Sequence, residues 1–464
     1  MKGRLHTYGT GEVIATDAPI KIGIIGHYGY GNLGDDTVVA ILIKNIRMHC
    51  PTADLFGFSL NPADTEQRHG IKTFPIRRQS DRPQHRSAPD PIADGKPGFY
   101  TTLKQWLKHL PWIFRPVKWL KTSLCEPIFS ELSFLRNSFH RLRGFDLLVV
   151  PGSSPLTDWW GGPWRHPYSM LSWSLLARIA GTEVVALSIG SERLDTRLGK
   201  VFCKWFLSLA QYRSFRDRYS CDAMRSLGLK GDNFIFPDQG FAALDVVHSN
   251  LVERTFAAPQ EQNAKLTVGV NPVGKWTCLP PGVPDSWYQE YIENLSALLL
   301  RILKRGHRVA FCPSDTSHDP PFVQQIMKIL KASYPDPDLD TQIIQDPILT
   351  VEDLILRIQR CDIMIASRFH GVVLAFVLQK PVLAISYSRK IGDLMSECGQ
   401  ADYHRGMDRA NVDDMNRLFC ALEQNRHSIG QHLGFVVSEY RFRLAEQYRN
   451  VFQRFRQGRQ YHDV

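Results

Sequence analysis

The residues best suited to chemistry lie between Asp362 and Gly371, where a short apolar run ends in Ser367-Arg368-Phe369-His370. The β-branched and aliphatic residues before this motif predict a buried strand, and the apolar run from Val372 to Leu378 predicts a helix directly after it. A fixed cation and a titratable imidazole would then lie at the carboxyl end of a strand and the amino end of a helix. In open α/β sheets ligands bind at that edge, and the free N–H groups of a helix start favour anions.

A second predicted strand, Val382 to Tyr387, leads to Ser388-Arg389-Lys390. Cations and a histidine on adjacent strand ends indicate a site for a small, heavily charged anion. The alternative is structural, because a buried Arg368 needs a partner; Asp362 and Glu397 are the candidates. Lys390 could equally be a solvated loop residue.

A glycine-rich turn, Gly26 to Asp36, joins the predicted strand Ile20 to Ile25 to a predicted helix, Asp36 to His49. Its glycines either let the backbone approach a ligand or form a plain tight turn with Asp35 or Asp36 as N-cap. Although the glycine spacing matches a dinucleotide motif, the acidic residue that would bind a ribose, Asp54, precedes the second strand, which argues against NAD.

Other strand ends carry small or charged residues. Val149 to Ser154 runs into a turn of small residues, which suits either close ligand approach or ordinary turn geometry. Arg216 follows a polar-aromatic strand, where it could bind a ligand or pair with Asp217 or Asp222. His318, in a turn at another strand end, is a further candidate for lining a site.

These motifs belong to two series of alternating strands and helices, one ending near residue 245 and one beginning at Lys265 to Val270. Such alternation predicts parallel sheets. We therefore expect an α/β protein with two Rossmann-like domains, residues 1–245 and 246–464, that face each other across a cleft. The helical tail, Met415 to Gln457, could cross back to the first domain.

Size and composition limit the class of protein. The chain has 464 residues, too many for one ordinary core, and its hydrophobic fraction of 43% excludes wholesale disorder. A net charge of +10 fits an anionic partner without identifying it. Met1 to Pro19 lacks the apolar stretch of a secretory signal, and no apolar run approaches the roughly 20 residues that span a bilayer. Nine scattered cysteines form no C-x-x-C pair, so we expect a soluble, cytoplasmic protein with reduced thiols and no metal site.

An insertion at about residues 77–143 has two parts. Arg77 to Gly98 is polar and predicts a solvated loop, whereas Phe99 to Arg143 interleaves tryptophans with lysines and arginines. The second part fits either a helix at the inner membrane face, as a peripheral contact, or a helical insertion that packs its aromatics on the first domain. Nucleic acid is not an expected partner, because the stretch matches no known binding module.

Taken in order, the motifs resemble the polysaccharide pyruvyl transferase family. The match comprises the turn Gly29 to Asp35, the small-residue turn after Val150, Phe215-Arg216-Asp217-x-x-Ser220, Pro237-Asp238, Ser367-Arg368-x-His370, and Pro381-Val382 leading to Ile385-Ser386-Tyr387 and Lys390. It covers roughly residues 20–60 and 145–400. Two departures concern the acceptor side: Pro151-Gly152-Ser153-Ser154 replaces a glycine triplet, and the shorter members lack the insertion.

The resemblance implies a GT-B-like fold and transfer of pyruvate from phosphoenolpyruvate onto a sugar as a ketal, with release of phosphate. It assigns Arg216, Arg368 and Lys390 to the phosphate and carboxylate of this donor, and His370 to acid–base catalysis. The substrate-binding residues would be Asn32, Gly34, Asp35, Ser153, Ser154 and Ser367, with Asp35 as a candidate base for the sugar hydroxyl. The scheme requires no cofactor and no metal.

The expected function is therefore ketal-pyruvyl transfer onto a nucleotide- or lipid-linked precursor during exopolysaccharide biosynthesis. One alternative is a GT-B-like glycosyltransferase that uses a nucleotide sugar; it would usually carry a second-domain carboxylate for the donor, and none is evident near Arg368. The other is a non-catalytic, polysaccharide-binding relative, whose function would survive replacement of His370 by alanine.

Overall fold

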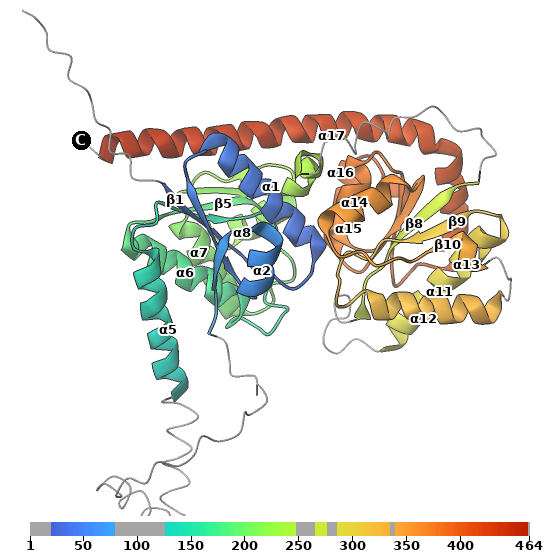
Figure 1. Ribbon diagram of the computed structural model, residues 1–464, viewed down its shortest axis with the longest axis horizontal. Coiled ribbons are helices and arrows are strands. Elements are labelled where there is room, and N and C mark those ends of the chain that lie inside the picture. The colour runs from blue at the N-terminus through green and yellow to red at the C-terminus, as the bar shows by residue number, and fades with distance from the viewer. Residues whose placement is uncertain (1–19, 79–125, 247–264, 276–284, 335–338, 463–464) are drawn as a thin grey trace, which may run out of the picture.

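The computed structural model describes residues 20–78, 126–246, 265–275, 285–334 and 339–462. They form two α/β domains side by side, each built around a parallel sheet, and one long helix lies along both (Figure 1). Most of the expected solvated loop, and most of the expected basic-aromatic segment, fall on residues 79–125 and so lie outside the described residues. Arg77, the first residue of the loop, is described and is not solvated: it is partly buried and donates to Oγ of Ser169 at 2.8 Å.

The first sheet has seven parallel strands in the order β3-β2-β1-β4-β5-β6-β7. Their bounds are β1 Lys21–Ile25, β2 Asp54–Ser59, β3 Lys72–Pro75, β4 Leu147–Val150, β5 Glu183–Ile189, β6 Tyr212–Phe215 and β7 Phe234–Ile235. The helices between them are α1 Leu33–His49, α2 Pro62–His69, α5 Glu126–Leu142, α6 His166–Ala180, α7 Arg197–Leu209, α8 Arg218–Ser226 and the 3₁₀ segment η2 Gln239–Val246.

The second sheet has six parallel strands in the order β10-β9-β8-β11-β12-β13. Their bounds are β8 Thr267–Asn271, β9 Arg308–Phe311, β10 Ile343–Ile344, β11 Ile363–Ala366, β12 Val382–Ser386 and β13 His404–Gly406. The helices are α11 Asp285–Lys304, α12 Pro320–Ser333, α13 Leu339–Gln342, α14 Val351–Gln359, α15 Phe369–Val377, α16 Arg389–Glu397, η4 Ala401–Tyr403 and α17 Val412–His462.

Strand β4 shows how the sequence builds the core. All four of its residues are buried, and because successive side chains of a strand point to opposite faces, Leu147 and Val149 join one apolar cluster while Leu148 and Val150 join another. The first cluster continues into the second domain and includes residues of α1, η2, β11 and α15. The two domains therefore share a continuous buried apolar contact.

Helix α17 runs back from the second domain along the first (Figure 1). In the second domain, His432 lies 3.2 Å from the carbonyl of Cys398. In the first domain, the buried side chain of Gln447 accepts a hydrogen bond from Ser188 at 3.1 Å and donates one to Ser214. The helix thus joins the two domains on the side of the molecule away from α5.

Helix α1 begins three residues earlier than expected. Asn32 is the N-cap, because its side-chain oxygen accepts a hydrogen bond from the backbone of Gly34 at 3.2 Å, so the helix starts at Leu33 and not at Asp36. The alternative of Asp35 or Asp36 as N-cap is wrong: both lie in the first turn of the helix. Asp35 is thereby free of a capping role.

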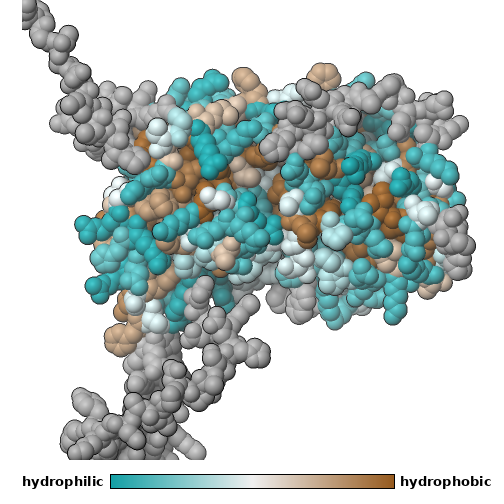
Figure 2. All heavy atoms as spheres, in the orientation of Figure 1, coloured by the Kyte–Doolittle hydropathy of each residue, from teal (hydrophilic) through white to brown (hydrophobic). Residues whose placement is uncertain are grey.

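On the face drawn in Figure 2, hydrophilic residues predominate over both domains, with smaller groups of apolar residues among them. No helix among the described residues is both long enough and apolar enough to cross a bilayer.

Candidate active site

The two domains meet at the carboxyl ends of their strands. The turn after β1 pairs with the turn after β9: the backbone N–H of Leu33 donates to the carbonyl of Ser314 at 2.8 Å, and that of Thr316 donates to Gly31 at 2.9 Å. Asn32 and Asp315 form a β-bridge at the same place. These contacts close one side of the interdomain space and hold the glycine-rich turn against the second domain.

Beside this contact is a cavity of about 480 Å³ whose walls come from both domains. Eight of the predicted site residues line it: Asn32, Asp35, Ser153, Ser154, Arg216, Arg368, His370 and Lys390. They come from loops far apart in the sequence, and they meet because parallel strands present their carboxyl ends at one edge of each sheet. His318, the further candidate, also lines the cavity.

His370 lies in the first turn of α15, and its imidazole faces the first domain. Its Nε2 is enclosed and lies 3.7 Å from Oδ1 of Asp238, which leaves Nδ1 as the ring nitrogen available to a ligand. Burial alone would raise the pKa of the Asp238 carboxyl, but the hydrogen bond and charge of His370, with the charge of Arg216, bring it below its usual value. Asp238 is therefore an anion that can orient the imidazole and stabilise its protonated form.

Gly34 forms the floor under this imidazole. A Cβ atom at this position would lie 2.3 Å from Nδ1 of His370, closer than any real side-chain contact. Gly34 does not line the cavity itself; it supplies the space in which the ring of His370 lies.

Arg216 is buried at the boundary between the domains. Its guanidinium donates to Oγ of Ser154 at 3.0 Å and lies 3.4 Å from carboxylate oxygens of Asp217 and Asp238. The guanidinium also stacks over the ring of Phe369 in the second domain, 4.2 Å from its centroid. The alternative pairing with Asp217 is thus present, whereas Asp222 pairs with Arg225 on the surface.

Lys390 enters the cavity from the first turn of α16. Its side chain is mostly buried, its Nζ donates to the Glu192 carboxylate, and it lies 5.6 Å from the centroid of the Phe369 ring. Burial lowers the pKa of Lys390 to about 8, against a smaller opposing effect of Asp35. The interpretation of Lys390 as a solvated loop residue is wrong.

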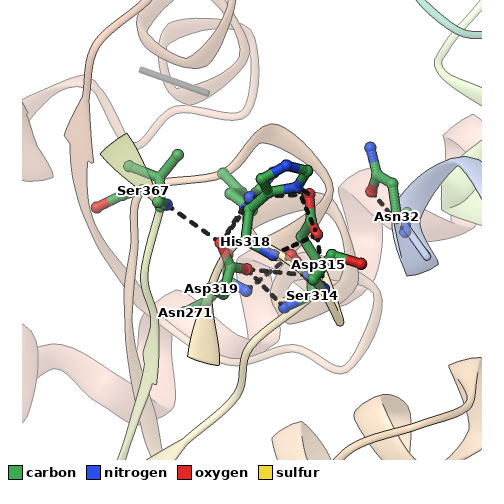
Figure 3. Close-up of polar contacts among 12 residues, drawn as sticks. Asn32, Asn271, Ser314, Asp315, His318, Asp319 and Ser367 are labelled. Atoms are coloured by element: carbon green, nitrogen blue, oxygen red, sulfur yellow. Dashed lines mark hydrogen bonds and ion pairs between the residues drawn. The ribbon is translucent and has the colours of Figure 1, made fainter. Parts of the chain in front are cut away.

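Arg368 is held by two carboxylates of its own domain. Its Nε and Nη2 donate to Oδ1 of Asp319 at 3.0 and 2.5 Å, and Nη2 lies 3.3 Å from Oδ2 of Asp315. Burial disfavours the charged guanidinium, but Asp319 and Asp315 outweigh this effect and raise the pKa of Arg368. Figure 3 shows Asp315 and Asp319 in the turn after β9, with the ring of His318 beside Asp315 and Asn32 of the first domain opposite.

The structural partners expected for Arg368 were the wrong residues. Asp362 accepts a hydrogen bond from the backbone of Thr267 instead, at 2.8 Å. Glu397 lies in a second, smaller cavity of about 280 Å³, whose lining shares Arg216, Phe369 and Lys390 with the larger one.

On the first-domain wall, the side chain of Asn32 donates to Oδ2 of Asp35 at 2.8 Å. Burial raises the pKa of Asp35; Asp36 and Asp238 add to the effect, and His370 and Lys390 oppose it. A carboxylate with a raised pKa is a stronger base than an ordinary one. Asp35 lies where it could accept a proton from a hydroxyl in the cavity.

Ser367 lies apart from these residues. Its side chain is buried, and its Oγ lies 2.8 Å from the hydroxyl of Tyr291 within the second domain. The structure does not bring Ser367 to the cavity wall, where a substrate-binding role would place it.

Several cavity residues have no assigned role in the sequence analysis. Glu192 could have been found as the acidic residue that follows the end of β5. Asp238, which lies behind His370 and does not line this cavity, appears in the sequence analysis only within a motif. His27, His166 and Trp160 also line the cavity, and no sequence signal indicates them. No group of three or more histidine, cysteine or acidic side chains among the described residues is arranged to hold a metal ion.

Solved structures with the same arrangement support the fold. The UDP complex of MnaA from S. aureus matches with a TM-score of 0.52 at 11% identity, covering 89% of this chain and 90% of the other. UDP-GlcNAc 2-epimerase from Neisseria meningitidis, bound to UDP-GlcNAc, matches with a TM-score of 0.50 at 13% identity, covering 90% and 99%. At such identities the likeness shows the fold alone. The expected GT-B-like fold with two Rossmann-like, parallel-sheet domains is confirmed.

No curated protein matches this sequence. The sequence model of the family described as polysaccharide pyruvyl transferase matches residues 32–389, the greater part of the chain, and this range contains every residue of the predicted site except Lys390, which follows its last residue. The resemblance drawn from the motifs is thereby confirmed: the chain belongs to the polysaccharide pyruvyl transferase family, and so is a transferase.

Proposed function

We propose that this protein transfers pyruvate from phosphoenolpyruvate onto two hydroxyls of a saccharide, forms a ketal and releases phosphate. The observation that carries the proposal is the convergence of Arg216, Arg368, Lys390 and His370 on one cavity between the domains, in a chain of this family. Phosphoenolpyruvate carries up to three negative charges on few atoms, and such a ligand needs several cations.

Arg216 and Lys390 are the cations best placed to meet the donor. Arg216 is fixed by Ser154 and by the ring of Phe369, so its orientation is set before a ligand arrives. Lys390 is paired with Glu192, and an incoming phosphate or carboxylate would compete with that carboxylate for the ammonium group. Arg368 is paired more tightly than Arg216: it lies 2.5 Å from Asp319 and 3.3 Å from Asp315, whereas the two carboxylates beside Arg216 lie at 3.4 Å. The main contribution of Arg368 is therefore to hold the wall of the cavity.

The reaction needs one proton donor and one proton acceptor. His370, with Asp238 behind it, would protonate the methylene carbon of phosphoenolpyruvate while a sugar hydroxyl bonds to the adjacent carbon. A second hydroxyl then displaces phosphate from the same carbon. Asp35 would accept a proton from a hydroxyl, and its raised pKa suits that role.

The acceptor is proposed to be a nucleotide- or lipid-linked precursor of a surface polysaccharide, made in the cytoplasm with peripheral contact to the inner membrane face. The experiment is to incubate the protein with carbon-labelled phosphoenolpyruvate and separate pools of nucleotide-linked and lipid-linked saccharides. Label that enters a saccharide in one pool, with equimolar release of phosphate, supports the proposal and identifies the carrier. Transfer of a sugar from a nucleotide sugar, with no use of phosphoenolpyruvate, would replace it by the glycosyltransferase alternative.

A further inference from the structure

Two histidines of the first domain form a stacked pair on the wall of the large cavity. The rings of His27, after β1, and His166, at the start of α6, lie with centroids 3.5 Å apart and planes 7° apart. Both line the cavity, and neither takes part in the proposed chemistry. Such close, parallel stacking is stable only if the two imidazoles are not both charged.

The surroundings keep both rings neutral. Burial, the neighbouring His166 and the charge of Arg77 lower the pKa of His27 well below its usual value. Burial and the charges of Arg77 and Arg165 lower the pKa of His166 to about 3. Nη2 of Arg77 lies 3.0 Å from Nε2 of His27; because arginine can only donate, this nitrogen accepts and Nδ1 carries the proton.

The pair has unsatisfied hydrogen-bonding groups. Nδ1 of His27 and Nδ1 of His166 are both enclosed without a hydrogen-bond partner. Buried polar groups normally have partners, and those that lack them indicate a ligand or a functional state in which they are satisfied.

Arg77 and Arg165 place positive charge beside this pair. Arg77 is held by Oγ of Ser169 at 2.8 Å and by His27, and burial and the charge of Arg165 lower its pKa to about 10. Within the described parts of the chain, neither arginine has a carboxylate at ion-pair distance, in contrast to Arg216, Arg368 and Lys390. Arg77 is half-buried and Arg165 is exposed. A half-buried guanidinium without an anion, such as that of Arg77, is a binding group for one.

The amino end of α6 adds to this charge. The helix has 15 residues, its N-cap Arg165 makes no side-chain capping bond, and its first turn has no acidic residue. Pro167 has no N–H group and the N–H of Tyr168 donates to the carbonyl of Pro163 at 3.0 Å, so this helix end contributes its positive dipole, at the position of His166. Trp160, between β4 and α6, and Tyr30, in the turn after β1, also line the cavity; they are 42% and 54% exposed.

We propose that His27, His166, Arg77, Arg165 and the amino end of α6 form a subsite for the phosphate group of a phosphorylated saccharide, with Trp160 as a surface for the sugar ring. Phosphate matches two guanidinium groups and the positive end of a helix, and the neutral imidazole of His166 can donate to a phosphate oxygen or accept from a sugar hydroxyl. This rests on the proposed function, in which the saccharide is the acceptor. Nucleotide-linked and lipid-linked saccharides share this phosphate.

The test is a calorimetric titration with two probes, glucose 1-phosphate and the uncharged methyl glucoside. Each is titrated into the wild type, Arg77→Gln and Arg165→Gln. The matched control is Arg178→Gln, an exposed arginine at the other end of α6. Arg216→Gln reports on the donor cations, and melting temperatures establish that each variant is folded.

We expect glucose 1-phosphate to bind the wild type more tightly than methyl glucoside does. Its affinity should fall about tenfold in Arg77→Gln and several-fold in Arg165→Gln, as for loss of a charge-assisted hydrogen bond, and stay unchanged in Arg178→Gln and Arg216→Gln. Loss in Arg216→Gln with no effect of Arg77→Gln would place the phosphate in the donor site and overturn the inference. So would the absence of a preference for the charged probe.

A second pair of probes identifies the carrier. UDP and farnesyl diphosphate present the same diphosphate on a nucleoside and on a lipid. Both should bind more weakly to Arg77→Gln than to the wild type. The probe that binds the wild type more tightly indicates the carrier. Phosphoenolpyruvate titrated into the same variants separates this inference from the proposed function. If phosphoenolpyruvate does not bind while glucose 1-phosphate behaves as expected, the proposed function fails and the subsite stands.

Discussion

His370 of the second domain and Asp238 of the first lie 3.7 Å apart, from Nε2 to Oδ1, so the acid–base pair exists only where the two domains meet. Neither domain alone contains it. The shared apolar contact through α1, η2 and α15, and the helix α17 that joins both domains, hold this pair together. Catalysis is therefore tied to the relative position of the domains.

Replacement of His370 by glutamine should lower kcat by about 10²- to 10⁴-fold, the usual contribution of a general acid or base. Affinity for phosphoenolpyruvate should change little, because the cations remain. Steady-state kinetics and calorimetry measure the two quantities. His140→Gln, an exposed histidine on α5, is the control. Undiminished turnover in His370→Gln would exclude His370 as the general acid or base.

Gly34→Ala tests the floor beneath the imidazole. The new Cβ would lie 2.3 Å from Nδ1 of His370 and displace the ring. We expect kcat to fall at least tenfold while the melting temperature changes by only a few degrees, because alanine is otherwise favourable in a helix. Gly434→Ala in α17, where the new Cβ meets only the flexible amide of Gln379 at 3.3 Å, is the matched control. Equal activity of the two variants would mean that the position of His370 does not matter.

The pKa of Lys390, about 8, predicts how donor binding depends on pH. Burial lowers this pKa, so the ammonium is charged below about pH 8 and loses its proton above it. Affinity for phosphoenolpyruvate should therefore decrease between about pH 7.5 and 9. Lys390→Arg keeps its charge throughout this range and should remove the decrease. Calorimetric titrations of the wild type and Lys390→Arg at several pH values test this. If the affinity for phosphoenolpyruvate depends on pH in the same way in both proteins, Lys390 does not belong to the donor site.

Arg368→Met should lower the free energy of unfolding of the protein, in addition to any effect on ligand binding. It leaves Asp315 and Asp319 buried without their partner, which costs about 3–5 kcal/mol. The free energy of unfolding from denaturant titration measures this. Arg360→Met, an exposed arginine at the end of α14, should be neutral. If Arg368→Met is as stable as the wild type, the carboxylates do not depend on Arg368, and its role lies with the ligand.

The sequence predicted which residues lie at the ends of strands, but not which side chains from distant parts of the chain pair with one another. The order of strands and helices placed Arg216, His370 and Lys390 at the edges of parallel sheets, and the structure brings all three to one cavity. The partners of Arg368 were mispredicted because Asp315 and Asp319 come from a turn about 50 residues away, brought near only by the pairing of β8 with β9 and β11.

The start of α1 differs from the prediction because several neighbouring residues could cap the helix. Asn32, Asp35 and Asp36 are all able to cap a helix, and the choice of Asn32 depends on the second-domain turn that fixes Leu33 by a backbone hydrogen bond to Ser314. The stacked pair joins His27, in the turn after β1, to His166, the first residue of α6, 139 positions away, so no periodicity or spacing in the sequence could indicate it.

We propose above all that the cavity between the domains binds phosphoenolpyruvate through Arg216 and Lys390. The most direct measurement is calorimetric titration of phosphoenolpyruvate into the wild type, Arg216→Gln, Lys390→Gln and the surface control Arg225→Gln, an arginine of α8 that contacts Asp222 and the carbonyl of Asn233. We predict binding by the wild type and the control, and at least a tenfold loss in each of the two cavity variants. Absence of binding by the wild type, or equal affinity in all four proteins, would contradict the account.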